Sequence, residues 1–161
     1  MWASVLSKLR SRKSQRGAAA LEFAVVVPVL LMLVCAMVDF AMLFNGQAIV
    51  TNGARDGVRA ASLGKKYDGT STVITKETGA LPNSSGVTWS VCTAATVDAA
   101  TWTCSSAATN VTAYDSARVI GSIVRVTVNY QYTWITPMPT WIGQGTTATI
   151  SQVSYMRIET T

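Results

Sequence analysis

The most prominent pattern in the chain is one long apolar run near its beginning. Residues 23–38 are 16 consecutive apolar positions, and within 18–44 only Glu22 and Asp39 are charged. As an α-helix, residues 18–44 would span about 40 Å at 1.5 Å per residue, which exceeds a bilayer core of roughly 30 Å. The core helix of a soluble protein would need partners on all its faces, which so small a chain can hardly supply. The pattern therefore predicts a transmembrane helix over 18–44.

After this run, apolar positions continue at helical spacing and predict that the helix extends over 45–64. The apolar stripe consists of Leu43, Val50, Ala54, Val58 and Ala61. Gly53 and Gly57 would let another backbone approach closely, although a plain loose helix interior fits the same spacing. We expect Gly64 to end the helix.

The C-terminal half contains the alternation typical of a sheet with one covered face. Apolar and polar positions alternate through 123–133, with apolar side chains at Val124, Val126, Val128, Tyr130 and Tyr132. A period of two predicts a strand, and the stripe of the long helix is its natural cover. Residues 146–158 are predicted to form a second long strand, antiparallel to the first.

The region 65–161 is otherwise expected to be a loop-rich β domain. Residues 69–115 are rich in Thr, Ser and Ala, and we expect irregular loops with short strands at 87–91 and 100–104. Trp134 and Trp141 flank a proline-containing turn at 136–139, and a core position is favoured over an exposed binding patch. Together, the patterns predict an α+β fold in which a long N-terminal helix packs on a small antiparallel sheet.

Charge is distributed unevenly and predicts the orientation of the chain. Five of the 13 basic residues precede Gly17 without any acid, and the eight remaining bases are balanced by eight acids. No basic patch remains that could bind the phosphates of a nucleic acid, so no nucleic-acid partner is predicted. The positive-inside rule instead places the leader, 1–17, in the cytoplasm and the C-terminal bulk outside, as a single-pass protein in membrane lipid.

Residue types also limit the chemistry. The chain has no histidine, which removes histidine-activated nucleophiles and histidine-bearing metal sites. No motif selects a catalytic, cofactor-binding or metal site, so we predict a protein that is not an enzyme and has no cofactor. Cys92 and Cys104 could form a disulfide outside the cytoplasm, worth roughly 3 kcal/mol, or remain two unpaired thiols. Cys35 is expected to pack as a small hydrophobe.

Three features of the apolar run leave alternatives open. A secretory signal cut after Ala36 is the main rival of a retained span, although Glu22 at the head of the apolar region is unfavourable for it. Pro28 favours a kink or local melting, or is simply a tolerated membrane proline. Asp39 is expected to reach toward the outer headgroups, with contact to a neighbouring subunit as the alternative.

The segment also resembles a known family. The residues that carry the resemblance are Arg16-Gly17, then Ala-Ala-Ala-Leu-Glu-Phe over 18–23, Val-Pro-Val-Leu-Leu over 27–31, Asp39-Phe40, Leu43-Phe44, and Thr-Asn-Gly-Ala-Arg-Asp-Gly-Val-Arg over 51–59. In this order and spacing they are similar to TadE-like minor pseudopilins. The resemblance covers about residues 15–62, and 65–161 share little with the family apart from 156–159.

The resemblance implies a pilin-like helix with a transmembrane half and an exported half. It implies removal of the leader after Gly17 by a prepilin peptidase, so that Ala18 becomes the N-terminus. It further implies a bacterial inner-membrane protein that acts with other pilins and pseudopilins in assembling a Tad (Flp-type) pilus, which supports surface attachment. A membrane-anchored binding module or adhesin that never enters a filament is the alternative.

Glu22 and Phe23 are the predicted assembly residues. Cleavage creates an α-amino group on Ala18, with a pKa near 8, and Glu22 lies one helical turn further along on the same face. A carboxylate in lipid costs up to about 2.5–3.5 kcal/mol at the bilayer centre, which a neighbouring amine would offset. We therefore expect Glu22 to pair with the Ala18 amine of an adjacent subunit and set the docking register. In the alternative, Glu22 only reaches toward the cytoplasmic headgroups.

Overall fold

The computed structural model describes residues 3–106, 109–136, 140, 143 and 145–160, with side chains described from Gly17 onward. The chain forms two compact units, Met1–Phe40 and Ala41–Thr161. Each is described below by itself.

The longest element is helix α1, Ala3–Ser62. It passes through Pro28 as continuous α-helix, so the local melting considered above does not occur there. Gly64 follows the helix with a φ of +92°, a conformation that favours glycine. The N–H of Gly64 donates to the carbonyl of Ala61 (3.3 Å), and that of Lys65 to the carbonyl of Ala60 (3.1 Å). These two bonds form a Schellman motif, which confirms Gly64 as the helix stop.

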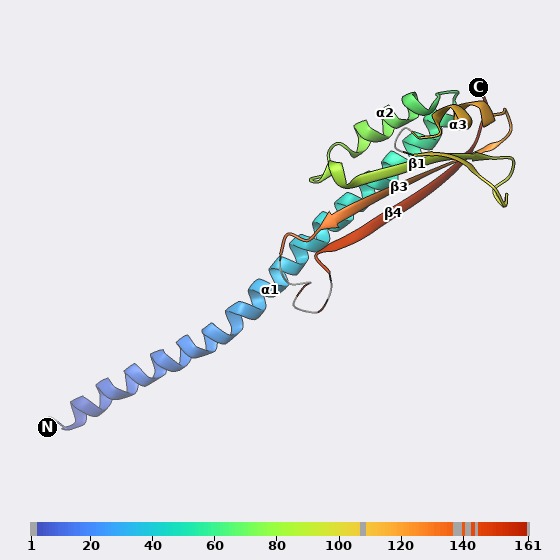
Figure 1. The fold of residues 1–161 in the computed structure, drawn as a ribbon. Helices are drawn as coiled ribbons and strands as arrows, with labels where there is room; N and C mark the ends of the chain where they lie inside the picture. The colour runs from blue at the N-terminus through green and yellow to red at the C-terminus, as the bar shows by residue number, and fades with distance from the viewer. Residues whose placement is uncertain (1–2, 107–108, 137–139, 141–142, 144, 161) are drawn as a thin grey trace. The chain divides into compact units, whose positions relative to one another are not determined.

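The second unit contains a four-stranded antiparallel sheet. Its strands are β1 (Val87–Ala94), β2 (Thr103–Ser106), β3 (Ile123–Thr133) and β4 (Thr147–Arg157). The strand order is β2-β1-β3-β4, so β4 is a long edge strand and β2 a short one. Figure 1 shows the sheet beside the C-terminal part of α1, drawn in cyan. The α+β fold predicted from the sequence is therefore present.

The alternation predicted for β3 is confirmed. Its five apolar residues at even positions are all buried, while the side chains between them are half-buried or exposed. They pack against the predicted stripe of α1, in which Val50, Ala54 and Ala61 are fully buried and Val58 nearly so. Strand β4 pairs with β3 in continuous antiparallel register from Ile123↔Arg157 to Thr133↔Thr147. The second long strand is thus confirmed, within one residue at each end.

The prediction of irregular loops with short strands over 69–115 was wrong where helices form. Two helices occur instead near this region, α2 (Tyr67–Thr78) and α3 (Val111–Ala117), with a 3₁₀ turn η1 at Ser84–Gly86. The short strand expected at 87–91 is confirmed and longer. The one expected at 100–104 begins later, at Thr103.

Threonine explains why α2 was missed. Tyr67, Thr70, Ile74 and Thr78 are buried at helical spacing, but two of these four are polar and interrupt the apolar pattern. The buried Thr78 hydroxyl donates to the carbonyl of Ile74 at 2.8 Å, which satisfies it inside the helix. Tertiary packing therefore overrides a weak local helix preference.

The glycine pair of α1 provides the surface on which α2 packs. A Cβ added at Gly57 would lie 2.6 Å from Cγ1 and 2.9 Å from Cδ1 of Ile74. A Cβ added at Gly53 would lie 3.0 Å from Cγ2 of Thr78. The close approach that this spacing indicated is thus an intramolecular one, between α1 and α2.

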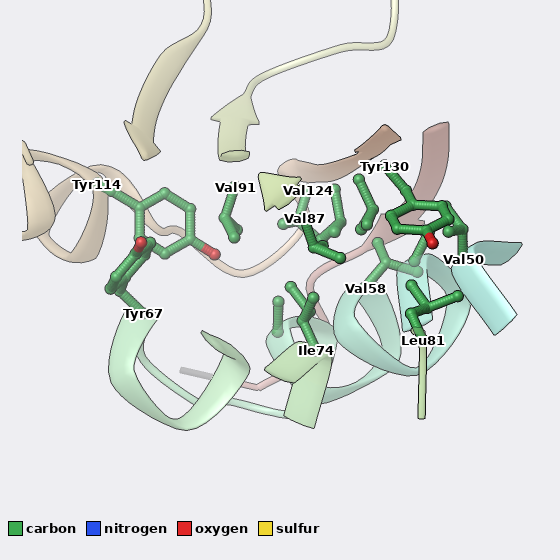
Figure 2. Close-up of a cluster of buried hydrophobic side chains, with 14 of the residues drawn as sticks. Val50, Val58, Tyr67, Ile74, Leu81, Val87, Val91, Tyr114, Val124 and Tyr130 are labelled. Atoms are coloured by element: carbon green, nitrogen blue, oxygen red, sulfur yellow. The ribbon is translucent and has the colours of Figure 1, made fainter. Parts of the chain in front are cut away.

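One hydrophobic core joins the helices to the sheet. Figure 2 shows its labelled side chains converging from α1, α2, α3, β1 and β3. Tyr67 and Tyr114 contact each other edge to face, with ring centroids 6.5 Å apart. Trp134 packs partly buried against this core and contacts Tyr132 edge to face at 5.4 Å, whereas Trp141 lies outside the described residues.

Candidate functional site

The N-terminal part of α1 exposes apolar side chains on all sides. Leu21 and Phe23 are each 70% exposed, and most residues between 24 and 38 are exposed as well. The helix is long and apolar enough to cross a membrane, and none of its most apolar stretch is buried. A core helix of a soluble protein would be largely buried, so this helix fits a single-pass membrane anchor.

The junction between Gly17 and Ala18 lies at the head of this apolar surface. Both residues are exposed, and a Cβ added at Gly17 would meet no atom within 4 Å. The side chains that precede this junction lie outside the description. The predicted cleavage site is therefore on open helix surface, with small residues on both sides of the peptide bond.

Glu22 is the one acidic side chain of the described apolar surface between residues 17 and 38. It is exposed, and it lies four residues after Ala18 in continuous helix, which puts both on the same face. Phe23 follows it and is also exposed, on a different face. The geometry places a single carboxylate one turn from the position where cleavage would create an amine.

Asp39 differs from its prediction. Its side chain is only 3% exposed, so it does not extend into the surroundings as a headgroup-seeking carboxylate would. This burial had no signal in the sequence, where Asp39 is simply the last acid of the apolar run.

The two cysteines Cys92 and Cys104 lie opposite each other on β1 and β2 and are joined by a disulfide in the structure. Cys92 is 1% exposed, and Cys35 is a free, partly exposed cysteine of α1. The register alone brings the two sulfurs together, because directly opposed residues on antiparallel strands have neighbouring side chains. The oxidised state in the native compartment stays a prediction.

Two side chains of the α3 region connect the helices, and sequence analysis did not single them out. Arg118 is 8% exposed and donates from Nη2 to the carbonyl of Ala61 (3.0 Å) and from Nη1 to that of Gly64 (3.4 Å). Its cation thus lies at the C-terminus of α1, where the helix dipole favours it. Asp115 accepts a bond from the backbone N–H of Tyr67 (3.0 Å), the first residue of α2. These contacts join positions about 50 residues apart, for which a single sequence gives no signal.

Among the described residues, no group of three or more His, Cys, Asp or Glu side chains is placed to hold a metal ion. The candidate functional features remain the exposed apolar helix, the Gly17–Ala18 junction and Glu22.

Comparison with protein families adds an independent finding. Residues 17–59 match the family model described as TadE-like protein. The matched range begins at Gly17 and includes the anchor, Glu22 and the glycine pair that receives α2. No match was found among curated proteins or among solved structures. The match confirms, over these residues, the resemblance seen in the sequence, and it suggests a protein associated with the Tad pilus.

Proposed function

We propose that this chain is a minor pilin or pseudopilin of a Tad (Flp-type) pilus, processed after Gly17 and acting in the assembly or initiation of the filament. One observation supports the proposal above all. Within the TadE-like segment, the largely exposed apolar stretch 17–38 carries a single carboxylate, Glu22, one turn beyond a junction of small residues.

The proposed mechanism begins in the inner membrane, with residues 1–17 in the cytoplasm and 65–161 on the other side. Prepilin peptidase hydrolyses the peptide bond between Gly17 and Ala18 and leaves an α-ammonium group on Ala18. Glu22 of one subunit then pairs with the Ala18 ammonium of its neighbour, while Phe23 and the adjacent apolar side chains pack between helices. The ion pair sets the register, since any other stagger leaves a charge unpaired in an apolar surrounding.

The assembled pilus would contact surfaces through the C-terminal unit. The membrane lipid holds the subunit before assembly, and neighbouring pilins replace the lipid as the environment of the apolar helix afterwards. This exchange explains why the same surface is apolar on all sides but still contains one acid.

The role of Glu22 is tested by replacing it in the native host. We expect Glu22→Ala and Glu22→Gln to leave membrane insertion intact and to abolish recovery of the subunit with sheared pili. Asp56→Asn, which removes an exposed acid on the C-terminal part of α1, is the matched control and should incorporate normally.

Immunoblots of the membrane and pilus fractions give the readout. Normal incorporation of Glu22→Ala would contradict the pairing mechanism. A wild-type subunit that stays in the membrane fraction, and whose loss leaves pilus formation intact, would instead favour an anchored binding module.

A further inference from the structure

The outer face of the sheet, opposite α1, has an unusual charge pattern. The four strands contain two charged residues, Arg125 and Arg157, and no Asp or Glu. Both arginines occupy odd positions, whose side chains point away from the core formed by the even positions of β3. Other odd positions of β3 and β4 carry mainly hydroxyl and amide groups, at Thr127, Asn129, Gln131, Thr133, Thr147, Thr149 and Ser151. The outer face is thus polar and cationic.

Two aromatic rings lie with these arginines. Cys92, Arg125 and Tyr155 face one another across β1, β3 and β4. The Cζ atom of Arg125 lies 4.4 Å from the ring centroid of Trp102, and the rings of Trp102 and Tyr155 lie 6.1 Å apart at 58°. Arg157 follows Tyr155 by two residues and therefore lies on the same face. We call Trp102, Arg125, Tyr155 and Arg157 the outer-face cluster.

The outer-face cluster is accessible and electrostatically unbalanced. Tyr155 is 48% exposed and Arg157 is exposed, while Trp102 and Arg125 are half-buried. Arg125 donates from Nη2 to Sγ of Cys92 at 3.6 Å, and its buried Nε has no partner among the described residues. Arg157 donates from Nε to the carbonyl of Gly121 (3.1 Å). Within the described part of the chain neither guanidinium is paired with a carboxylate, so the charge of the cluster is complementary to an anion.

We propose that the outer-face cluster binds an acidic polysaccharide. A sugar ring presents apolar C–H faces, for which the exposed Tyr155 ring and the half-buried Trp102 beside it are suitable surfaces. Guanidinium groups match the planar geometry of a carboxylate and can bind it through two parallel hydrogen bonds. The hydroxyl and amide side chains of β3 and β4 extend the same surface along the strands and can bond to sugar hydroxyls.

A nucleic acid fits this surface less well. Its binding depends on neutralising many phosphates, each with a Lys or Arg. The sheet offers two cations, and the side chains beyond residue 17 are neutral overall. An acidic polysaccharide has carboxylates spaced along a hydroxyl-rich chain. It therefore matches two arginines on a polar face better than a nucleic acid does.

The disulfide acts here as a positioning element. Trp102 lies two residues before Cys104, and Cys92 lies directly opposite Arg125 on the neighbouring strand. Joining β2 to β1 therefore holds Trp102 over Arg125. Reduction should weaken polysaccharide binding while leaving the pairing of β3 with β4, and so the positions of Tyr155 and Arg157, in place.

The full-length protein in detergent micelles, titrated with polygalacturonate in affinity electrophoresis, provides the test. Trp102→Ala, Arg125→Gln and Tyr155→Thr should each weaken binding by about tenfold, as expected for aromatic and arginine anchors. Arg55→Gln, on the exposed face of α1, is the matched control and should bind like wild type. Neutral dextran and an oligo(dT) strand should bind at least about tenfold more weakly than polygalacturonate.

Several outcomes would overturn the proposal. They are absence of polygalacturonate binding, equal binding of dextran, tighter binding of oligo(dT), or variants that bind like wild type. Because Trp102→Ala could disturb the fold, Tyr155→Thr and Arg157→Gln on the exposed strand β4 provide a second test, with thermal melts to confirm folding. The assay does not depend on leader cleavage or pilus formation, so its failure is distinct from a failure of the assembly mechanism.

Discussion

At the scale of single residues, the glycines of α1 show how a small local choice determines packing. The helix contains Gly53 and Gly57 although glycine is a poor helix former, costing about 1 kcal/mol relative to alanine. Their missing side chains allow Ile74 and Thr78 of α2 to approach the α1 backbone. The two glycines thus lower the intrinsic helix propensity of α1 but allow α2 to pack closely against it.

Gly57→Ala should therefore destabilise the fold despite its better helix propensity. The new Cβ would overlap Ile74, and overpacking of this kind costs about 1–3 kcal/mol. Chemical denaturation measures the loss, with Asn52→Ala on the exposed side of α1 as a control that should change little. The double variant Gly57→Ala/Ile74→Ala should have a higher free energy of unfolding than Ile74→Ala alone, because the shortened side chain leaves room for the new Cβ. If the losses of the two single variants simply add in the double variant, the two residues do not interact.

Tyr114 is a second residue whose behaviour follows from its surroundings. It is fully buried, its hydroxyl has no hydrogen-bond partner among the described residues, and burial raises its pKa to about 12. The nearby Arg118 lowers the pKa and Asp115 raises it, but both effects are smaller than that of burial.

Tyr114→Phe should stabilise the protein by about 1 kcal/mol at neutral pH, because it removes an unsatisfied hydroxyl. The advantage should grow as pH rises from 10 to 12, since the unfolded wild-type chain loses the Tyr114 proton near pH 10 and the folded chain only near 12. Denaturation curves at pH 7 and pH 11 test this. A variant less stable than wild type at both pH values would mean that the hydroxyl has a partner in solution.

At the scale of elements, prediction from sequence succeeded where one pattern was strong and local. The apolar run, the stripe of α1 and the alternation of β3 each repeat over three or more turns or pleats, so occasional exceptions do not hide them. Helix α2 was missed because threonines fill part of its buried face. The outer-face cluster was missed because Trp102, Arg125 and Tyr155 come from three separate segments. Their contact depends on strand register, which a single sequence does not specify.

The disulfide between β1 and β2 belongs to this scale, because it joins a four-residue edge strand to the rest of the sheet. We expect the exported protein to be oxidised, so that its intact mass is lower by two hydrogens than after reduction. Reduction should lower the free energy of unfolding by about 3 kcal/mol. A Cys92→Ala/Cys104→Ala variant should start at this lower stability and show no further change with reductant. Free thiols at both positions in protein from the native envelope would contradict the prediction.

At the scale of the whole molecule, the chain combines a segment shared with a family and a segment with its own chemistry. The TadE-like match ends at residue 59, three residues before α1 ends, so the family's signature lies on the helix alone. The sheet, the disulfide and the outer-face cluster all lie beyond it. This division fits a subunit that assembles through its helix and contacts its surroundings through its sheet.

The proposed function depends most on one event, the proposed cleavage after Gly17, which would turn an anchored precursor into a subunit able to pair through Glu22. The most direct test is the N-terminal residue of the mature protein purified from its native host, read by Edman degradation or by mass spectrometry of the N-terminal peptide. We expect this residue to be Ala18. A chain that still begins at Met1 on functional pili, or one that begins at Met37 after a secretory signal, would contradict it.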